Sequence, residues 1–181
     1  MTHQTLALVG AVGGAGTTRT TVECGATLAR AGRDVAILDA AFATQGLADY
    51  VPGSIETDLT QVVTDEVALE DALVPIATEA SGDLVAAPAR APFERVARAK
   101  TAGAADRFER AVAAAGLSHD VVIVDTPPVA ANQAVAAVSA CDRVGLVAPG
   151  TARGADGLAR LTGVVEDVGA TVTGTVTNRG E

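Results

Sequence analysis

The sequence has 181 residues, which suits one globular domain large enough to bury a core. Its formal net charge is -9 and its isoelectric point about 4.6, so the chain repels nucleic-acid phosphates and direct DNA binding is not expected. Aromatic residues make up 2% of the chain, too few to stack against single-stranded nucleic acid. No apolar run is long enough to span a bilayer, and the chain does not begin with a signal-peptide pattern. We therefore expect a cytoplasmic protein without a membrane anchor of its own.

The two cysteines, Cys24 and Cys141, have neither the spacing of a metal site nor the density of a disulfide framework. We expect them to be buried free thiols. Lys100 is the single lysine among 13 basic residues. This preference for arginine, together with abundant alanine and acidic residues, is the composition of a salt-adapted protein.

The predicted secondary structure alternates along the whole chain between short β-rich apolar runs and alanine-rich helical stretches. This alternation predicts an α/β fold of three layers, a mostly parallel central sheet with helices on both faces, in a single domain over residues 1–181. The predicted strands are 5–12, 35–38, 84–87, 121–124, 144–148 and 172–177. The predicted helices are 17–31, 58–64, 67–74, 93–100, 104–115 and 154–168.

The first motif is the glycine-rich segment from Gly10 to Thr18, which follows the first predicted strand and opens the first predicted helix. Glycines let main-chain N–H groups approach an anion closely, and a helix N-terminus adds the positive end of its dipole. A phosphate site is therefore predicted here. The spacing of Gly10, Gly13 and Gly16 also fits a dinucleotide fold, in which Asp39 at the end of the second strand would accept a hydrogen bond from a ribose hydroxyl.

Two further motifs lie at the ends of later strands. The apolar strand 121–124 is followed by Asp125-Thr-Pro-Pro, and a carboxylate at this edge can hold a metal ion or a metal-bound water beside phosphates. The alternative is a helix-capping aspartate that binds no ligand. The last strand ends in Thr177-Asn-Arg, where the amide of Asn178 can read a base edge through its paired donor and acceptor.

Taken together, GGAGTT, LDA, DTPP and GTVTNR at successive strand ends resemble the ParA/MinD family of P-loop ATPases over most of the chain. The resemblance implies that ATP or ADP binds with Mg²⁺ in a deviant Walker A loop. It implies that Thr18 offers its hydroxyl to the metal, Asp125 lies in the metal's outer coordination shell and Asn178 meets adenine. Asp39 would be the catalytic acid. The residues that would wrap the phosphates are Gly13, Gly14, Ala15, Gly16, Thr17 and Thr18.

Three positions depart from the family pattern. Val12 stands where the family has its signature lysine, Thr17 replaces the lysine that bridges the terminal phosphates, and Ala41 replaces the acid that pairs with Asp39. Losing one charge-assisted hydrogen bond costs about 1.5 to 3 kcal/mol, so nucleotide affinity should fall roughly ten- to a hundredfold. Hydrolysis should suffer more, since fixed charge at the transition state is usually the largest catalytic contribution.

The expected function is accordingly a nucleotide-dependent switch with weak or absent hydrolysis, able to form a homodimer and to signal to a protein partner. Two alternatives stay open at this point. A degenerate family member would serve as an interaction scaffold without nucleotide. A dinucleotide-binding module is disfavoured, because DTPP and NR are not typical of it and Tyr50 and Lys100 cannot form its Tyr-x-x-x-Lys pair.

Overall fold

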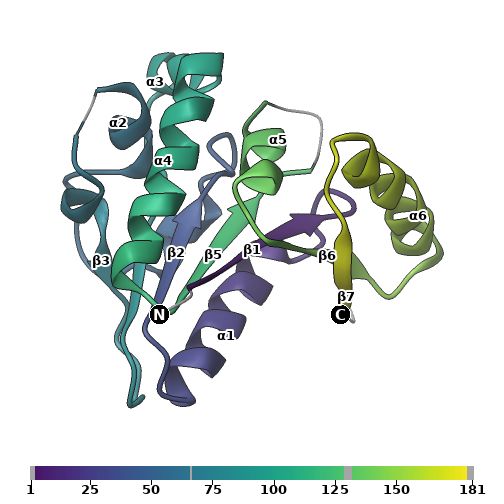
Figure 1. The fold of residues 1–181 in the computed structure, drawn as a ribbon, viewed down its shortest axis with the longest axis horizontal. Helices are drawn as coiled ribbons and strands as arrows, with labels where there is room; N and C mark the ends of the chain where they lie inside the picture. The colour runs from purple at the N-terminus through teal and green to yellow at the C-terminus, as the bar shows by residue number, and fades with distance from the viewer. Residues whose placement is uncertain (1–2, 66, 129–131, 179–181) are drawn as a thin grey trace.

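The computed structural model describes residues 3–65, 67–128 and 132–178, and its core is a twisted sheet between two layers of helices (Figure 1). Seven strands of these residues pair in the order β3-β4-β2-β5-β1-β6-β7, and all pairs are parallel except that of β3 with β4. The strands are β1 Gln4–Gly10, β2 Val35–Asp39, β3 Val74–Pro75, β4 Leu84–Ala87, β5 Val121–Thr126, β6 Arg143–Pro149 and β7 Val172–Asn178.

The helices divide unequally between the two faces of the sheet. Helix α1 packs against one face, where its core residues meet β2, β5 and the short 3₁₀ helix η1. The remaining helices cover the other face. The helices are α1 Thr17–Arg30, α2 Leu59–Thr64, α3 Phe93–Ala99, α4 Ala102–Ser118, α5 Asn132–Ser139 and α6 Ala152–Asp167, with 3₁₀ helices η1 Gly46–Tyr50 and η2 Leu69–Ala72. The predicted three-layer α/β fold is confirmed.

The central strands β2 and β5 are apolar up to their carboxyl ends, where Asp39 and the pair Asp125-Thr126 lie, because both faces of these strands are covered. Every residue of β2 and of β5 is buried. Along β2, Ile37 packs in the core on the side of α1 and Leu38 packs against the opposite helical layer. Because β2 and β1 each pair in parallel with β5, the carboxyl ends of the three strands lie side by side. Ligands bind at this edge in open parallel sheets.

Several predicted boundaries were wrong. Residues 67–74, predicted as a helix, form the 3₁₀ helix η2 and then β3, because Val74 pairs with Ala86 at the edge of the sheet. The first strand ends at Gly10 rather than at residue 12, and Gly103 lies in the first turn of α4 instead of separating two helices. Helix α5 was not predicted. Cys24 and Cys141 are free thiols as predicted, although each is only partly buried.

A bulge in β7 determines the face of the sheet to which the side chains at the end of this strand point. Val144 pairs with Val172 but Gly145 pairs with Gly174, so Thr173 is an extra residue, and its hydroxyl donates a hydrogen bond of 2.9 Å to the Val144 carbonyl. One extra residue reverses the side-chain alternation of the strand after it. Val172 thus packs with the α6 layer, whereas Asn178 reaches the α1 layer.

A helix that crosses a membrane must be both long and apolar. Within residues 3–65, 67–128 and 132–178, no helix meets both conditions.

Candidate functional site

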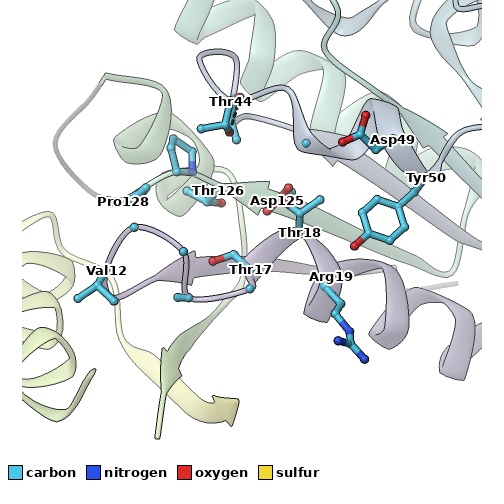
Figure 2. A pocket seen from close by; sticks show the side chains of 17 residues that line it. Val12, Thr17, Thr18, Arg19, Thr44, Asp49, Tyr50, Asp125, Thr126 and Pro128 are labelled. Carbon is cyan, nitrogen blue, oxygen red and sulfur yellow. Dashed lines mark hydrogen bonds between the residues drawn. The ribbon is translucent and has the colours of Figure 1, made fainter. Parts of the chain in front are cut away.

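A cavity of about 400 Å³ opens at the carboxyl edge of β1, β2 and β5 (Figure 2). Its walls come from the loop between β1 and α1, from η1 with the loop before it, and from the segment after β5. The structure therefore brings together the glycine-rich motif and Asp125, which are over a hundred residues apart in the sequence. The lining residues are Val12, Gly13, Gly14, Ala15, Gly16, Thr17, Thr18, Arg19, Ala41, Thr44, Gly46, Asp49, Tyr50, Asp125, Thr126, Pro127 and Pro128.

The glycine-rich loop has the backbone of an anion cradle. Gly14 and Gly16 have φ angles of 77° and 79°, a left-handed conformation that side chains disfavour. Gly16 is also the N-cap of α1 and supplies no side-chain cap. The first-turn N–H groups of α1 are therefore available to an anion, together with the positive end of the helix dipole.

Asp125 and Thr18 lie beside each other on the cavity wall (Figure 2). Asp125 is 1% exposed, and this burial raises the pKa of its carboxyl to about 6, although a hydrogen bond from the Thr18 hydroxyl lowers it. The buried Oδ2 atom of Asp125 has no hydrogen-bond donor among the described residues. Buried polar atoms are nearly always satisfied, so this orphan oxygen indicates a missing partner. A carboxylate and a hydroxyl are oxygen ligands that suit Mg²⁺ or its bound water.

Asp39 is fully buried next to this pair and does not line the cavity. Its carboxylate accepts hydrogen bonds from the N–H groups of Ala41 at 2.8 Å and Ala89 at 3.2 Å, and from that of Leu47. Burial and the charge of Asp125 raise its pKa to about 7, against the effect of these backbone bonds. The carboxylate thus ties the segment after β2, which lines the cavity, to the segment after β4.

Asn178 fastens the end of β7 to the glycine-rich loop and does not line the cavity. Its Nδ2 donates to the carbonyl of Ala15 at 2.9 Å and to the hydroxyl of Thr20 at 3.0 Å. A Cβ atom at Gly16 would lie 2.8 Å from this nitrogen, so the strand approaches the loop closely because residue 16 is a glycine. Both N–H donors of the amide are in use, and Oδ1 is the group that remains for a base.

Val12 and Thr17, two positions at which the sequence departs from the ParA/MinD pattern, pack against other parts of the chain. Val12 lies against α6, where a Cβ at Gly157 would lie 2.8 Å from its Cγ1 atom. The hydroxyl of Thr17 lies close to Gly10, since a Cβ there would be 2.6 Å from it. Both side chains therefore help to fix the loop against its surroundings.

The charges on the cavity wall are few and mixed. Among the described residues that line it, Arg19 is the one with a positive charge, and its Nε atom lies 2.8 Å from Oε1 of Glu23. The negative charges belong to Asp49 and Asp125. Sequence reasoning missed Asp49 and Tyr50, because they lie on η1 in a stretch without clear periodicity; the Asp-Tyr pair carried no motif that would have found them.

The model of the AAA domain family matches residues 3–177. The chain belongs to this family. Among curated proteins, no sequence matches significantly.

Several solved structures share the fold. MinD from Pyrococcus horikoshii, complexed with Mg-ADP, has a TM-score of 0.84 at 20% identity, covering 98% of this chain and 70% of that one. The kinase domain of the Escherichia coli tyrosine kinase Etk has a TM-score of 0.81 at 21% identity, covering 98% and 68%. Cobyrinic acid a,c-diamide synthase from Mycobacterium smegmatis, with ADP and magnesium, has a TM-score of 0.78 at 23% identity, covering 97% and 74%. This AAA domain thus has the ParA/MinD-type P-loop fold.

Proposed function

We propose that the chain binds ATP or ADP with Mg²⁺ in this cavity and acts as a nucleotide-dependent switch with weak or absent hydrolysis. The observation that carries the proposal is the unpartnered Oδ2 atom of Asp125, buried beside the Thr18 hydroxyl at the foot of the glycine-rich loop. The MinD and synthase structures that share the fold carry ADP with magnesium, which supports the choice of ligand.

Each part of the site has a role in this proposal. The main-chain N–H groups of residues 13–18 hold the phosphates, the hydroxyl of Thr18 binds the metal, and Asp125 accepts a hydrogen bond from a metal-bound water. Bound Mg²⁺ supplies positive charge to the phosphates. Asn178 meets adenine through Oδ1, the atom left over by its bonds to the loop.

Weak hydrolysis follows from the charges that line the cavity. Phosphoryl transfer depends on fixed positive charge around the terminal phosphate and on a residue that orients the attacking water. Arg19 is engaged with Glu23, and Asp49 and Asp125 add negative charge. Asp39, the proposed catalytic acid, acts through the loops and through Asp125, because its own oxygens are held by backbone N–H groups.

The switch signals to a protein partner and works as a single domain in the cytoplasm.

A second candidate function has one observation in its favour: the negative charge of the residues that line the cavity opposes the binding of a polyphosphate. In that case the chain is an interaction scaffold that binds no nucleotide.

Titration calorimetry with ATP-Mg, ADP-Mg and NAD, at low and high salt, distinguishes these functions. We expect heat for both adenine nucleotides and none for NAD, and about tenfold weaker binding after Thr18→Val. Thr162→Val is the control, because it removes a helical threonine hydroxyl that donates to the Leu158 carbonyl on α6, away from the cavity. Absence of heat at millimolar adenine nucleotide supports the scaffold, and a clear NAD signal supports a dinucleotide module.

A further inference from the structure

Gln45 joins two parts of the cavity wall in an unfavourable backbone conformation. Its φ angle is 54°, and among residues 3–65, 67–128 and 132–178 it is the one residue other than glycine with a positive φ. Thr44 before it and Gly46 after it line the cavity, and η1, which begins directly after Gln45, carries Asp49 and Tyr50 on the same wall (Figure 2). A residue with a Cβ atom keeps a left-handed conformation only where its surroundings hold it there.

The side chain of Gln45 is held by the segment after β4. Its Nε2 atom donates to the carbonyl of Ala91 at 2.9 Å, and its Oε1 atom accepts from the N–H of the same residue at 3.2 Å. Nε2 also donates to the carbonyl of Phe42 at 3.2 Å, and the N–H of Gln45 donates to the carbonyl of Ala41 at 2.9 Å. One amide thus fixes the turn after β2 and binds it to a residue 46 positions further along the chain.

A second connection between the same two segments lies closer to the sheet. The carboxylate of Asp39, which is fully buried, accepts from the N–H groups of Ala41 and Ala89. Gln45 is only partly buried and binds further along both segments. Asp39 therefore holds the inner ends of the two segments together, and Gln45 holds their outer ends.

The residue bound by Gln45 does not line the cavity but leads into α3. Pro92, next to Ala91, is the N-cap of α3. Within α3, Nη1 of Arg95 lies 3.3 Å from Oδ2 of Asp58, which caps the N-terminus of α2. A displacement of Ala91 is therefore passed to the start of α3 and from there to α2.

The other end of this path reaches the side of the cavity where the metal is proposed to bind. A Cβ atom at Gly46 would lie 3.3 Å from Oγ1 of Thr18, the hydroxyl assigned to Mg²⁺. Any ligand of this hydroxyl has to fit against the main chain at Gly46, the residue directly after Gln45.

We propose that Gln45 is a positioning residue that couples the cavity wall to α3. A ligand beside Thr18 displaces Gly46, and the amide of Gln45 passes the displacement through Ala91 to α3. The inference rests on the proposed function, because it takes ADP or ATP with Mg²⁺ as that ligand. Coupling of this kind is reciprocal, so a change in the position of α3 changes the affinity of the cavity for the nucleotide by the same factor.

Hydrogen exchange of the Val96 N–H, followed by NMR, tests the coupling in the full chain. This group donates to the Pro92 carbonyl at 3.1 Å in the first turn of α3. Gln45→Gly keeps the left-handed backbone accessible and removes the amide, so without nucleotide the exchange should become about tenfold faster. Unchanged exchange overturns the proposal, because α3 then does not depend on Gln45. Gln61→Ala is the control, since it removes a glutamine side chain that accepts from the N–H of Asp58 on α2, away from the cavity.

Displacing the wall without a ligand tests the transmission. Gly46→Val pushes a branched side chain against Thr18 and should change the exchange rate of Val96 by about threefold. Gly46→Ala makes the same contact with a smaller side chain and serves if the valine variant does not fold. In a Gln45→Gly background the response should vanish, whereas in a Gln61→Ala background it should remain. No response in the unaltered background, or an equal response with Gln45→Gly, overturns the proposal.

Saturating ADP-Mg, with binding followed by calorimetry, should give the same pattern of responses. Heat without a response at Val96 overturns the coupling and leaves the proposed function intact. Absence of heat contradicts the proposed function, and the responses to Gly46→Val then decide whether Gln45 couples the wall to α3.

Discussion

The side-chain nitrogen of Asn178 lies 2.9 Å from the carbonyl oxygen of Ala15, so the last strand of the sheet is hydrogen-bonded to the glycine-rich loop. The same nitrogen also binds the hydroxyl of Thr20 on α1. The loop conformation therefore depends on a residue 163 positions further along the chain. This contact predicts effects on stability that are separable from base recognition.

Asn178→Ala should lower the free energy of unfolding by about 1 to 3 kcal/mol, because it removes two hydrogen bonds and leaves the Ala15 carbonyl without its donor. Chemical denaturation measures this loss. Thr20→Val removes one of the two bonds of the amide and the bond from the Thr20 hydroxyl to the Gly16 carbonyl. It should cost less, because the Gly16 carbonyl keeps the N–H of Thr20 as a donor and the Ala15 carbonyl keeps Asn178. An Asn178→Ala protein of unchanged stability would contradict the structural role of this amide.

Gly157→Ala should displace the glycine-rich loop. The added Cβ would lie 2.8 Å from Cγ1 of Val12 and 2.9 Å from the carbonyl oxygen of Ala11, which is backbone and cannot rotate away. Overpacking of this kind costs about 1 to 3 kcal/mol, measured by thermal unfolding, and nucleotide affinity should fall with it. Gly163→Ala on the same helix is the control: its Cβ meets nothing within 4 Å, so it should stabilise the helix by about 0.5 to 1 kcal/mol.

Thr17→Lys should increase nucleotide affinity about tenfold, because an ammonium group at this position of the loop reaches the phosphates. Calorimetric titration with ADP-Mg measures the gain. Thr17→Met has a side chain of similar length without charge and should show none. Equal affinities for the two variants would mean that residue 17 does not point at a bound phosphate.

Stability should fall as pH rises from 4 to 7. The pKa of Asp125 is raised from 3.8 to about 6 and that of Asp39 to about 7, mainly by burial, so the folded state keeps protons that the unfolded chain releases. Unfolding in this range releases protons and becomes easier with increasing pH. Asp125→Asn removes one titrating group and should raise the free energy of unfolding at pH 8 by on the order of 2 kcal/mol.

Denaturation series at pH 5 and pH 8 measure this difference. Adding Mg²⁺ at pH 8 should stabilise the unaltered chain more than the Asp125→Asn variant, since the metal neutralises the buried carboxylate. If the variant is no more stable than the unaltered chain at pH 8, burial of the Asp125 charge carries no measurable cost.

The parts of the fold that were predictable are those in which local pattern and burial agree. The strands around Ile37 and Ile123 are apolar up to their carboxyl ends, and the long helix that ends at Arg30 is followed by a glycine, Gly32. The predictions failed where neighbours decide the structure. Val74 is extended because it pairs with Ala86 of β4. A strand of two residues is too short to show a periodic pattern in the sequence.

The features of the site that could be predicted are those that depend on the local backbone. Gly14 and Gly16 adopt the conformations for which glycine is needed, and Asp125 lies at the carboxyl end of a buried strand, one residue before its last. The contacts of Asn178 could not be predicted, since the face on which it lies depends on the bulge at Thr173. The placement of Asp49 depends on how η1 folds over the cavity.

The bulge at Thr173 lets the two parts of the last strand direct their side chains independently. The position of Val172, before the bulge, is fixed by its packing with the α6 layer. The position of Asn178, after the bulge, is fixed by its hydrogen bond to the glycine-rich loop. Changes in length at the turn around Gly169 should therefore be tolerated as long as Thr173 keeps its bond to Val144. A single residue gained or lost between Thr173 and Asn178 would instead turn the amide to the opposite face and leave the loop without its anchor.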